Sequence, residues 1–210
     1  MAGRPEEYLW RKDVARWRER WNVSTEREYL DATLREGTTQ NGVFGARIMW
    51  PYLGEAVDLL ATATGVRGSP LEVFAAAFPG LRYIHLRRRD HLAQALSWAK
   101  AVQADIWYAA DNRSGPPTPP YDRDLIRNLL GLIEEADRGW SELLAASDLT
   151  SHPVDYEDLV ADPHGTAADL LRFIGTWHDG LRLSVTTERQ ADATNAAWIE
   201  QYRRDMASGV

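Results

Sequence analysis

Cysteine is absent from this chain of 210 residues. The protein therefore has no disulfide, no thiolate metal ligand and no cysteine nucleophile, and a reducing cytoplasm is the simplest compartment for it. Long apolar runs are also missing, since none approaches the roughly 20 residues of a membrane span. The N-terminus, MAGRPEEYLWRKD, has no apolar core of the signal-peptide kind. We predict a cytoplasmic protein with no membrane span.

Positive charge is the second shortage. The chain carries 24 Lys and Arg against 31 Asp and Glu, a formal net charge of −7. Nucleic-acid binding needs a basic surface that displaces counterions, so it is not expected here. Any anionic ligand must then be held by a local basic cluster. The acidic residues Asp155, Glu157 and Asp158 have no histidine at ligand spacing, so we interpret them as scaffold and predict no metal site.

The pattern of turns and apolar periods predicts a single α/β domain over residues 1–210. A helix is expected over residues 6–20, and a second is capped by Ser24 or Thr25, although Ser24-x-x-Arg27 is not a capping box. Further helices are expected over about 51–64, from a capping box at 69–72, and over 91 to about 109, about 122–146, 163–175 and about 192–206. Strands are expected over residues 43–50, 81–86 and 154–156. Because strands alternate with helices, we expect a parallel sheet flanked by helices.

Three consecutive arginines dominate the segment YIHLRRRDHLAQALSW, residues 83–98. The segment reads as a strand, the arginines, a capping Asp90 and a helix. A strand that leads into a helix N-terminus brings backbone N–H groups and the helix dipole to the carboxyl edge of the sheet. Arginines there supply paired donors for a phosphate. The alternative is a solvated helix start with surface ion pairs. We expect His85 to be a satisfied core or edge histidine rather than a base.

Four blocks together resemble the bacterial trehalose 2-sulfotransferase family, and they occur in the family's order. They are NGVFGARIMW, FPGLRYIHLRRRDHLAQALSWAKAVQ, VDYEDLVADPHGTAADLLRFIG and RQADATNAAWIEQYR. The resemblance implies a P-loop-like α/β fold and transfer of a sulfuryl group from phosphoadenosine phosphosulfate (PAPS) to a hydroxyl, with phosphoadenosine phosphate (PAP) as product and no metal. It also implies a carbohydrate or glycosylated acceptor and is compatible with a homodimer.

The resemblance assigns donor-binding roles to several positions. Arg89 and Ser97, with seven residues between them, look like the strand-end arginine and helix serine that grip the donor's 3′-phosphate in sulfotransferases. Arg87 belongs to the same basic run. The C-terminal block resembles a tail that folds over the nucleotide, which makes Arg189, Gln190 and Thr194 donor-site candidates. The alternative for this block is a terminal helix packed through Trp198 and Tyr202.

The acceptor-side candidates lie nearer the N-terminus. Sulfuryl transfer needs a base for the acceptor hydroxyl and donors for the charge on sulfur and leaving oxygens. Glu7, in GRPEEYL, matches the family's glutamate base, although the adjacent Glu6 leaves a one-residue ambiguity. The structural alternative is that both carboxylates lie in the first turn of a helix, where the helix dipole favours negative charge. Arg47 and Trp50, in NGVFGARIMW, are candidates for holding the acceptor or the sulfuryl group.

One family feature has no counterpart in the sequence. Sulfotransferases of this kind begin with a strand and a loop rich in arginine, serine and glycine around the 5′-phosphosulfate, and no such segment precedes Gly3. Three explanations stand: a truncated start, a non-catalytic descendant that only binds, or donor binding rebuilt by other residues or another subunit. We expect truncation. The leading hypothesis is thus a PAPS-dependent sulfotransferase, and the alternative is a non-catalytic binding protein of the same fold.

Overall fold

The computed structural model describes residues 2–105, 119–146, 150–183 and 193–208. Within them the chain is mostly helical with one small sheet. The elements are α1 (Arg11–Trp21), α2 (Glu26–Gly37), the 3₁₀ helix η1 (Trp50–Tyr52), α3 (Leu53–Thr64), α4 (Pro70–Ala77), β1 (Tyr83–Arg87), α5 (His91–Ala104), α6 (Arg123–Ala145), β2 (Ser151–Asp155), α7 (Tyr156–Ala161), α8 (Pro163–Phe173) and α9 (Ala193–Ala207). Across these ranges, no helix is long and apolar enough to cross a membrane.

Internal contacts divide the chain into two compact units. Unit 1 comprises Met1–Ile84, Ala146–His152 and Ala168–Leu181, and unit 2 comprises His85–Ala145, Pro153–Ala167 and Arg182–Val210. Each unit is described by itself below. The single domain over residues 1–210 stays a prediction.

Two capping boxes begin helices of unit 1. Thr25 accepts a hydrogen bond from the N–H of Glu28, and the Glu28 carboxylate accepts one from the N–H of Thr25. Ser69 and Glu72 make the same reciprocal pair at the start of α4, as the sequence predicts. Of the two caps predicted for α2, the structure has Thr25, and its box with Glu28 was not predicted because only the spacing of Ser24 with Arg27 was considered. The core of this unit contains Tyr8, Tyr29, Leu30, Leu60, Val73 and Phe74.

The predicted strand over residues 43–50 is wrong. In its place are two isolated bridges, Glu6 with Ala46 (parallel) and Thr38 with Phe44 (antiparallel), followed by η1. The backbones approach closely here, because Gly3 has a φ of +82° and an added Cβ would overlap the backbone of Gly45. This close crossing replaces a regular ladder, so β-propensity was overridden by the local packing.

The first predicted helix also begins later than expected. The sequence pattern places its start at residue 6, whereas α1 begins at Arg11. Glu6 instead forms an isolated bridge with Ala46, and neither Glu6 nor Glu7 belongs to a helix. This difference matters because it changes what holds the Glu7 carboxylate.

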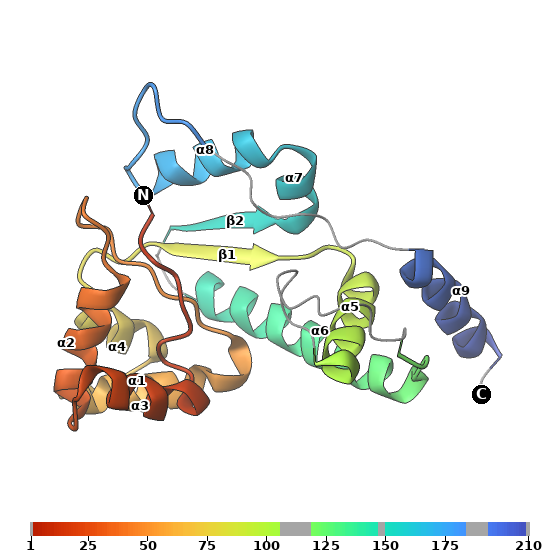
Figure 1. The fold of residues 1–210 in the computed structure, drawn as a ribbon, viewed down its shortest axis with the longest axis horizontal. Helices are drawn as coiled ribbons and strands as arrows, with labels where there is room; N and C mark the ends of the chain where they lie inside the picture. The colour runs from red at the N-terminus through yellow and green to blue at the C-terminus, as the bar shows by residue number, and fades with distance from the viewer. Residues whose placement is uncertain (1, 106–118, 147–149, 184–192, 209–210) are drawn as a thin grey trace. The chain divides into compact units, whose positions relative to one another are not determined.

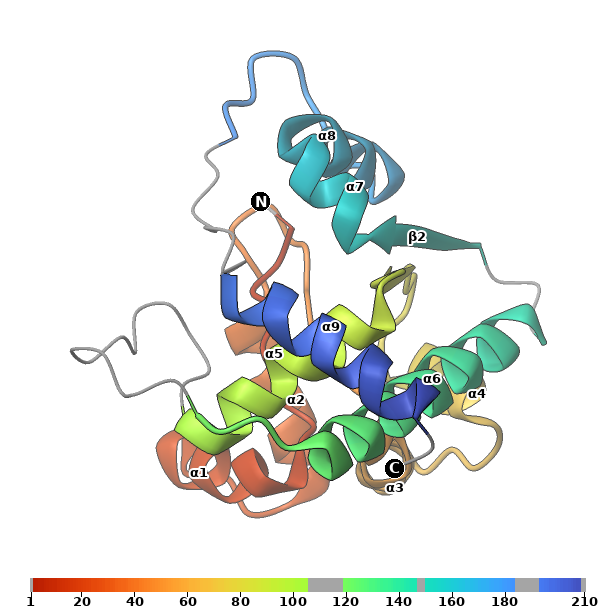
Figure 2. The same ribbon diagram turned by 90° about the vertical axis from the view of Figure 1, so that its right-hand side faces the viewer.

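Three helices form the core of unit 2. Figure 2 shows α5, α6 and α9 side by side, and their facing residues form one buried cluster. The cluster comprises Ala95, Leu96, Ala99, Ile126, Leu129, Ile133, Trp198 and Tyr202. Ala95, Leu96 and Ala99, the cluster residues on α5, all belong to the apolar face that the sequence pattern predicts for this helix. Trp198 and Tyr202 lie in the packed face of the terminal helix, as one of the two sequence interpretations expected.

The sheet of the described residues has two strands, β1 and β2, which run in the same direction (Figure 1). Each strand leads directly into a helix, β1 through a short turn into α5 and β2 into α7. The predicted strands 81–86 and 154–156 are confirmed in kind, with bounds shifted by one to three residues. The observed class is mixed α/β with a parallel pair. A P-loop-like arrangement stays a prediction.

The α2 capping box generates a prediction about acid stability. The N–H and hydroxyl of Thr25 and the N–H of Ser24 lower the pKa of Glu28 from its ordinary 4.5 to about 2. Since the folded pKa lies below the unfolded one, Glu28 stabilises the fold above pH 4.5, and this contribution disappears as the pH falls from 4.5 towards 2. We expect Glu28→Gln to lower the urea midpoint clearly at pH 7 and by a much smaller amount at pH 2.5, where most of this contribution has been lost. Glu134→Gln, at an exposed site on α6, is the control, and an equal loss at both pH values would contradict the assignment.

Candidate functional site

The arginine run at the end of β1 meets an acidic run at the end of β2. The Arg87 Nε donates to Asp155 Oδ1 at 2.6 Å. Arg89 donates through Nη2 and Nη1 to the two carboxylate oxygens of Asp158, at 2.6 and 3.1 Å, and through Nη1 to Asp155 Oδ2 at 3.3 Å. The parallel pairing of the two strands brings these residues together, because both runs follow the carboxyl end of a strand.

The middle arginine is held differently. Its guanidinium carbon lies 4.6 Å from the centroid of the Tyr156 ring, a cation–π contact, and its Nε lies 3.9 Å from Glu157 Oε1. Only a quarter of the Arg88 side chain is exposed. Arg88 therefore fixes the first residues of α7 against the turn that precedes α5.

The carboxylate of Glu157 closes the N-terminal end of α5. It accepts hydrogen bonds from the backbone N–H of Arg89 at 3.1 Å and of Asp90 at 3.2 Å. Asp90 itself caps the helix by accepting from the N–H of Ala93, as the sequence predicts. Burial disfavours the charged form of Glu157, yet the two backbone hydrogen bonds outweigh it and lower its pKa. Glu157 therefore holds these two backbone N–H groups in this structure, and the anion site at this strand end stays a prediction.

The paired charges differ in exposure. The Asp155 side chain is 13% exposed, whereas Arg89 and Asp158 are 54% and 58% exposed. The hydrogen bond from Arg87 lowers the pKa of Asp155, and the same bond raises that of Arg87. Arg87 and Asp155 thus form an inner pair that holds the strands, while Arg89 faces solvent. The sequence analysis interpreted the acidic run as scaffold. In the structure these carboxylates are the hydrogen-bond partners of the arginines.

The carboxylate of Asp137 lies near both of the histidines that flank the arginines. Asp137 of α6 places Oδ1 3.7 Å from His85 Nε2 and Oδ2 3.8 Å from His91 Nε2. Burial lowers the pKa of His85, against the opposing effect of Asp137. This agrees with the expectation of a satisfied core or edge histidine at residue 85.

The other donor-side candidates are placed to different extents. Ser97 is half-buried in the second turn of α5, a helix anchored by its buried neighbours Leu96 and Ala99. Arg189 and Gln190 lie outside the described residues, and Thr194 lies in the first turn of α9, where only the backbone is described.

On the acceptor side, Glu7 and Arg47 form an ion pair in unit 1, with Arg47 Nη2 3.0 Å from Glu7 Oε1. The bridge between Glu6 and Ala46, with the Arg47 N–H donating to the Glu6 carbonyl at 2.9 Å, sets the two segments side by side. Glu6 is exposed and Glu7 half-buried, so the two adjacent carboxylates are distinct. The alternative that Glu6 and Glu7 lie in the first turn of a helix is wrong, because α1 begins at Arg11.

Aromatic residues adjoin this ion pair. Tyr52 is buried, donates to the Arg47 carbonyl at 3.2 Å, and stacks on Trp10 with ring centroids 6.1 Å apart. Burial, with the nearby Glu7 carboxylate, raises the pKa of Tyr52. Trp50 is half-buried at the first residue of η1, three positions after Arg47. The pair is thus fixed on one side by a packed aromatic.

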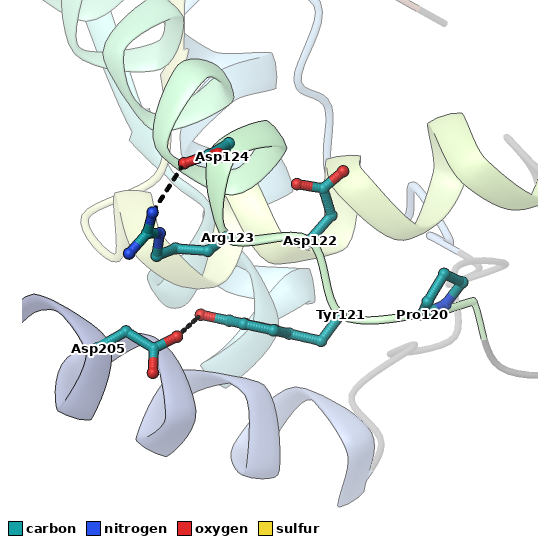
Figure 3. A pocket seen from close by; sticks show the side chains of 6 residues that line it. All are labelled: Pro120, Tyr121, Asp122, Arg123, Asp124 and Asp205. Atoms are coloured by element: carbon teal, nitrogen blue, oxygen red, sulfur yellow. Dashed lines mark hydrogen bonds and ion pairs between the residues drawn. The ribbon is translucent and has the colours of Figure 1, made fainter. Parts of the chain in front are cut away.

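An open cavity of about 470 Å³ lies elsewhere in unit 2, at the start of α6. Its lining residues are Pro120, Tyr121, Asp122, Arg123, Asp124 and Asp205 (Figure 3). Tyr121 donates to Asp205 at 2.7 Å, Asp122 caps the N–H of Leu125, and Arg123 pairs with Asp124. Three aspartates around one arginine do not suit an anionic donor, so this cavity is not part of the candidate site.

Sequence reasoning missed the pairing of the basic and acidic runs. The partners are 66 to 69 residues apart, so no local pattern joins them. A signal was nevertheless present: the basic run follows the predicted strand 81–86, the acidic run begins within the predicted strand 154–156, and the strands were expected to be parallel. Strand ends in a parallel sheet meet at one edge, which would have brought the opposite charges together.

The chain belongs to the Stf0 sulphotransferase family, whose sequence signature matches residues 1–205. It is 28% identical over 183 residues to a trehalose 2-sulfotransferase of Mycolicibacterium smegmatis, covering 85% of this chain and 66% of that relative. It is 24% identical over 171 residues to a trehalose 2-sulfotransferase of Mycobacterium tuberculosis, covering 80% and 64%. The chain thus spans about two thirds of the length of these relatives.

The graded exposure of the acidic run predicts unequal costs of neutralising it. We expect Asp155→Asn to lower the free energy of unfolding by about 1 kcal/mol, because the 13% exposed Asp155 carboxylate is the charged partner of both Arg87 and Arg89. Asp158→Asn should change it by less than about 0.5 kcal/mol, because that pair is exposed. Urea denaturation at pH 7 measures both. Equal costs would show that the two aspartates do not differ in structural role.

Proposed function

We propose that this protein is a PAPS-dependent sulfotransferase that moves a sulfuryl group to a hydroxyl of a sugar or sugar-bearing metabolite, with trehalose as the first acceptor to test. Membership of the family and the names of its two relatives support this reaction. The single observation that carries the donor half is the exposed guanidinium of Arg89 at the carboxyl end of β1, ahead of a helix that carries Ser97.

Arg89 and Ser97 are assigned to the donor's 3′-phosphate. A guanidinium presents N–H groups in a planar fork that matches a phosphate, and more than half of the Arg89 side chain is open to solvent. Arg87 is assigned a supporting role, since its Nε is committed to Asp155 at 2.6 Å. Arg189, Gln190 and Thr194 remain proposed contacts to the nucleotide. The donor supplies the activated sulfuryl group, and the residues named here hold and orient it.

Glu7 is assigned as the base and Arg47 as its positioning partner. In the reaction the acceptor oxygen forms a bond to sulfur, the bond from sulfur to the phosphate oxygen breaks, and the hydroxyl proton passes to the Glu7 carboxylate. The salt bridge of 3.0 Å fixes one carboxylate oxygen and leaves the other to accept that proton. Arg47, with 46% of its side chain exposed, retains N–H groups for a sulfuryl oxygen, and Trp50 is the proposed contact for the sugar.

Replacement of Arg89 tests the donor half. We expect Arg89→Ala to weaken PAP binding about 30-fold or more, because charged hydrogen bonds to the 3′-phosphate are lost, and Ser97→Ala to weaken it about 3- to 10-fold. Isothermal titration calorimetry of the full chain with PAP is the measurement. Arg27→Ala, an exposed arginine paired with Asp31 in α2, is the matched control. Unchanged affinity in Arg89→Ala would overturn the donor assignment.

Replacement of Glu7 tests the acceptor half. With labelled PAPS and trehalose, we expect Glu7→Gln to lower kcat about 100-fold or more and to leave PAP affinity within about twofold. The exposed neighbour Glu6→Gln is the control and should keep normal turnover. Normal turnover in Glu7→Gln, or a loss only in Glu6→Gln, would remove Glu7 as the base.

The alternative, a binding protein of the same fold without catalysis, makes a separate forecast. It expects PAP to bind with no transfer to trehalose or to other sugar acceptors. A hydroxyl acceptor that becomes sulfated by the wild-type chain excludes it.

A further inference from the structure

Arg89 has three carboxylate partners in unit 2, and they are of two kinds. Asp155 and Glu157 also accept hydrogen bonds from other groups of the structure. Asp155 also accepts the short hydrogen bond from Arg87, and Glu157 accepts two backbone N–H groups at the start of α5. Both carboxylates therefore have hydrogen bonds that do not depend on the Arg89 guanidinium. Asp155 and Glu157 are therefore the structural carboxylate partners of the Arg89 guanidinium.

Asp158 is the exposed partner. Both of its carboxylate oxygens accept from Arg89, Oδ1 from Nη2 at 2.6 Å and Oδ2 from Nη1 at 3.1 Å. This is the two-point geometry in which a guanidinium also binds a phosphate. The Asp158 side chain is 58% exposed, so it can turn into solvent without exposing an apolar surface.

We propose that Asp158 is an internal competitor for the donor's 3′-phosphate. In the absence of donor its carboxylate holds the Arg89 fork, and the phosphate replaces it when the donor binds. This inference rests on the proposed function, because it uses the phosphate site assigned to Arg89 and Ser97. It adds a residue that sets donor affinity by opposing it.

Charge at the site supports this role. Arg87, Arg88 and Arg89 contribute three positive charges, and Asp155, Glu157 and Asp158 contribute three negative ones within 4 Å of them. With Asp158 in place the cluster is neutral, which is a poor attractor for a dianionic phosphate. Once Asp158 turns away, Arg89 Nη2 is released for the phosphate while Nη1 still faces Asp155 at 3.3 Å, and the displaced carboxylate still repels the phosphate through solvent. Asp158 therefore weakens the hold on both donor and spent donor.

The test compares PAP and adenosine 5′-phosphate, which lacks the 3′-phosphate, on the full wild-type chain and on Asp158→Asn. We expect Asp158→Asn to bind PAP about 3- to 10-fold more tightly at low salt, with a smaller gain at 0.3 M salt because exposed charges are screened. Affinity for adenosine 5′-phosphate should not change. Asp169→Asn makes the same change in net charge at an exposed aspartate paired with Arg172, and it should leave PAP affinity unchanged.

A double variant, Arg89→Ala with Asp158→Asn, should lose the gain, because the gain depends on freeing that guanidinium. If wild type binds PAP and Asp158→Asn binds it equally or more weakly, the competitor role is overturned while the proposed function stands. An equal gain for adenosine 5′-phosphate would also overturn it, since the effect would then be general charge. If neither wild type nor Asp158→Asn binds PAP, the proposed function and this inference both fail. Asp158→Ala repeats the test should the asparagine variant misfold.

Discussion

Two parallel strands bring a basic turn and an acidic turn to one edge of a two-stranded sheet, and the resulting ion pairs organise the donor-side candidates. Three successive arginines without counter-charges would repel one another at the end of β1. Asp155 and Glu157 remove that cost by binding Arg87 and the backbone of the following turn. The turn is thereby fixed between β1 and α5, which sets where Arg89 emerges and where α5, with Ser97, begins.

The same constraint explains how an acidic protein can carry three successive arginines at the end of one strand. The chain carries a net charge of −7, and its basic run is locally neutralised rather than surrounded by further positive charge. The two ion pairs differ in the exposure of their carboxylates, which is 13% for Asp155 and 58% for Asp158. Arg87 and Asp155 act as structure, and Arg89 with Asp158 remains open to exchange. Under the donor assignment proposed above, affinity for the phosphate depends on the difference between two similar two-point contacts of Arg89, one with the phosphate and one with Asp158.

Unit 1 reaches its candidate residues by a different route, through close backbone crossing. Gly3 and Gly45 let the N-terminal segment lie against the segment that follows α2, and the bridge from Glu6 to Ala46 sets the register. That register brings Glu7 and Arg47 into a salt bridge of 3.0 Å. The hydroxyl of the buried Tyr52 donates to the backbone carbonyl of Arg47. The backbone that carries this surface ion pair is thus anchored to a packed aromatic side chain. Backbone approach, rather than a regular strand, therefore does the positioning here.

The sequence by itself determined the features that depend on neighbours along the chain. The box at Ser69, the Asp90 cap, the apolar face of α5 and the strand before the arginines all follow from residues within a turn or two of each other. Tertiary structure decided the partners of Arg87 and Arg89, the start of α1 at Arg11 and the loss of a strand at residues 43–50. Those outcomes depend on segments that are far apart in the chain, and local propensity carries no information about which distant carboxylate or backbone a residue will meet.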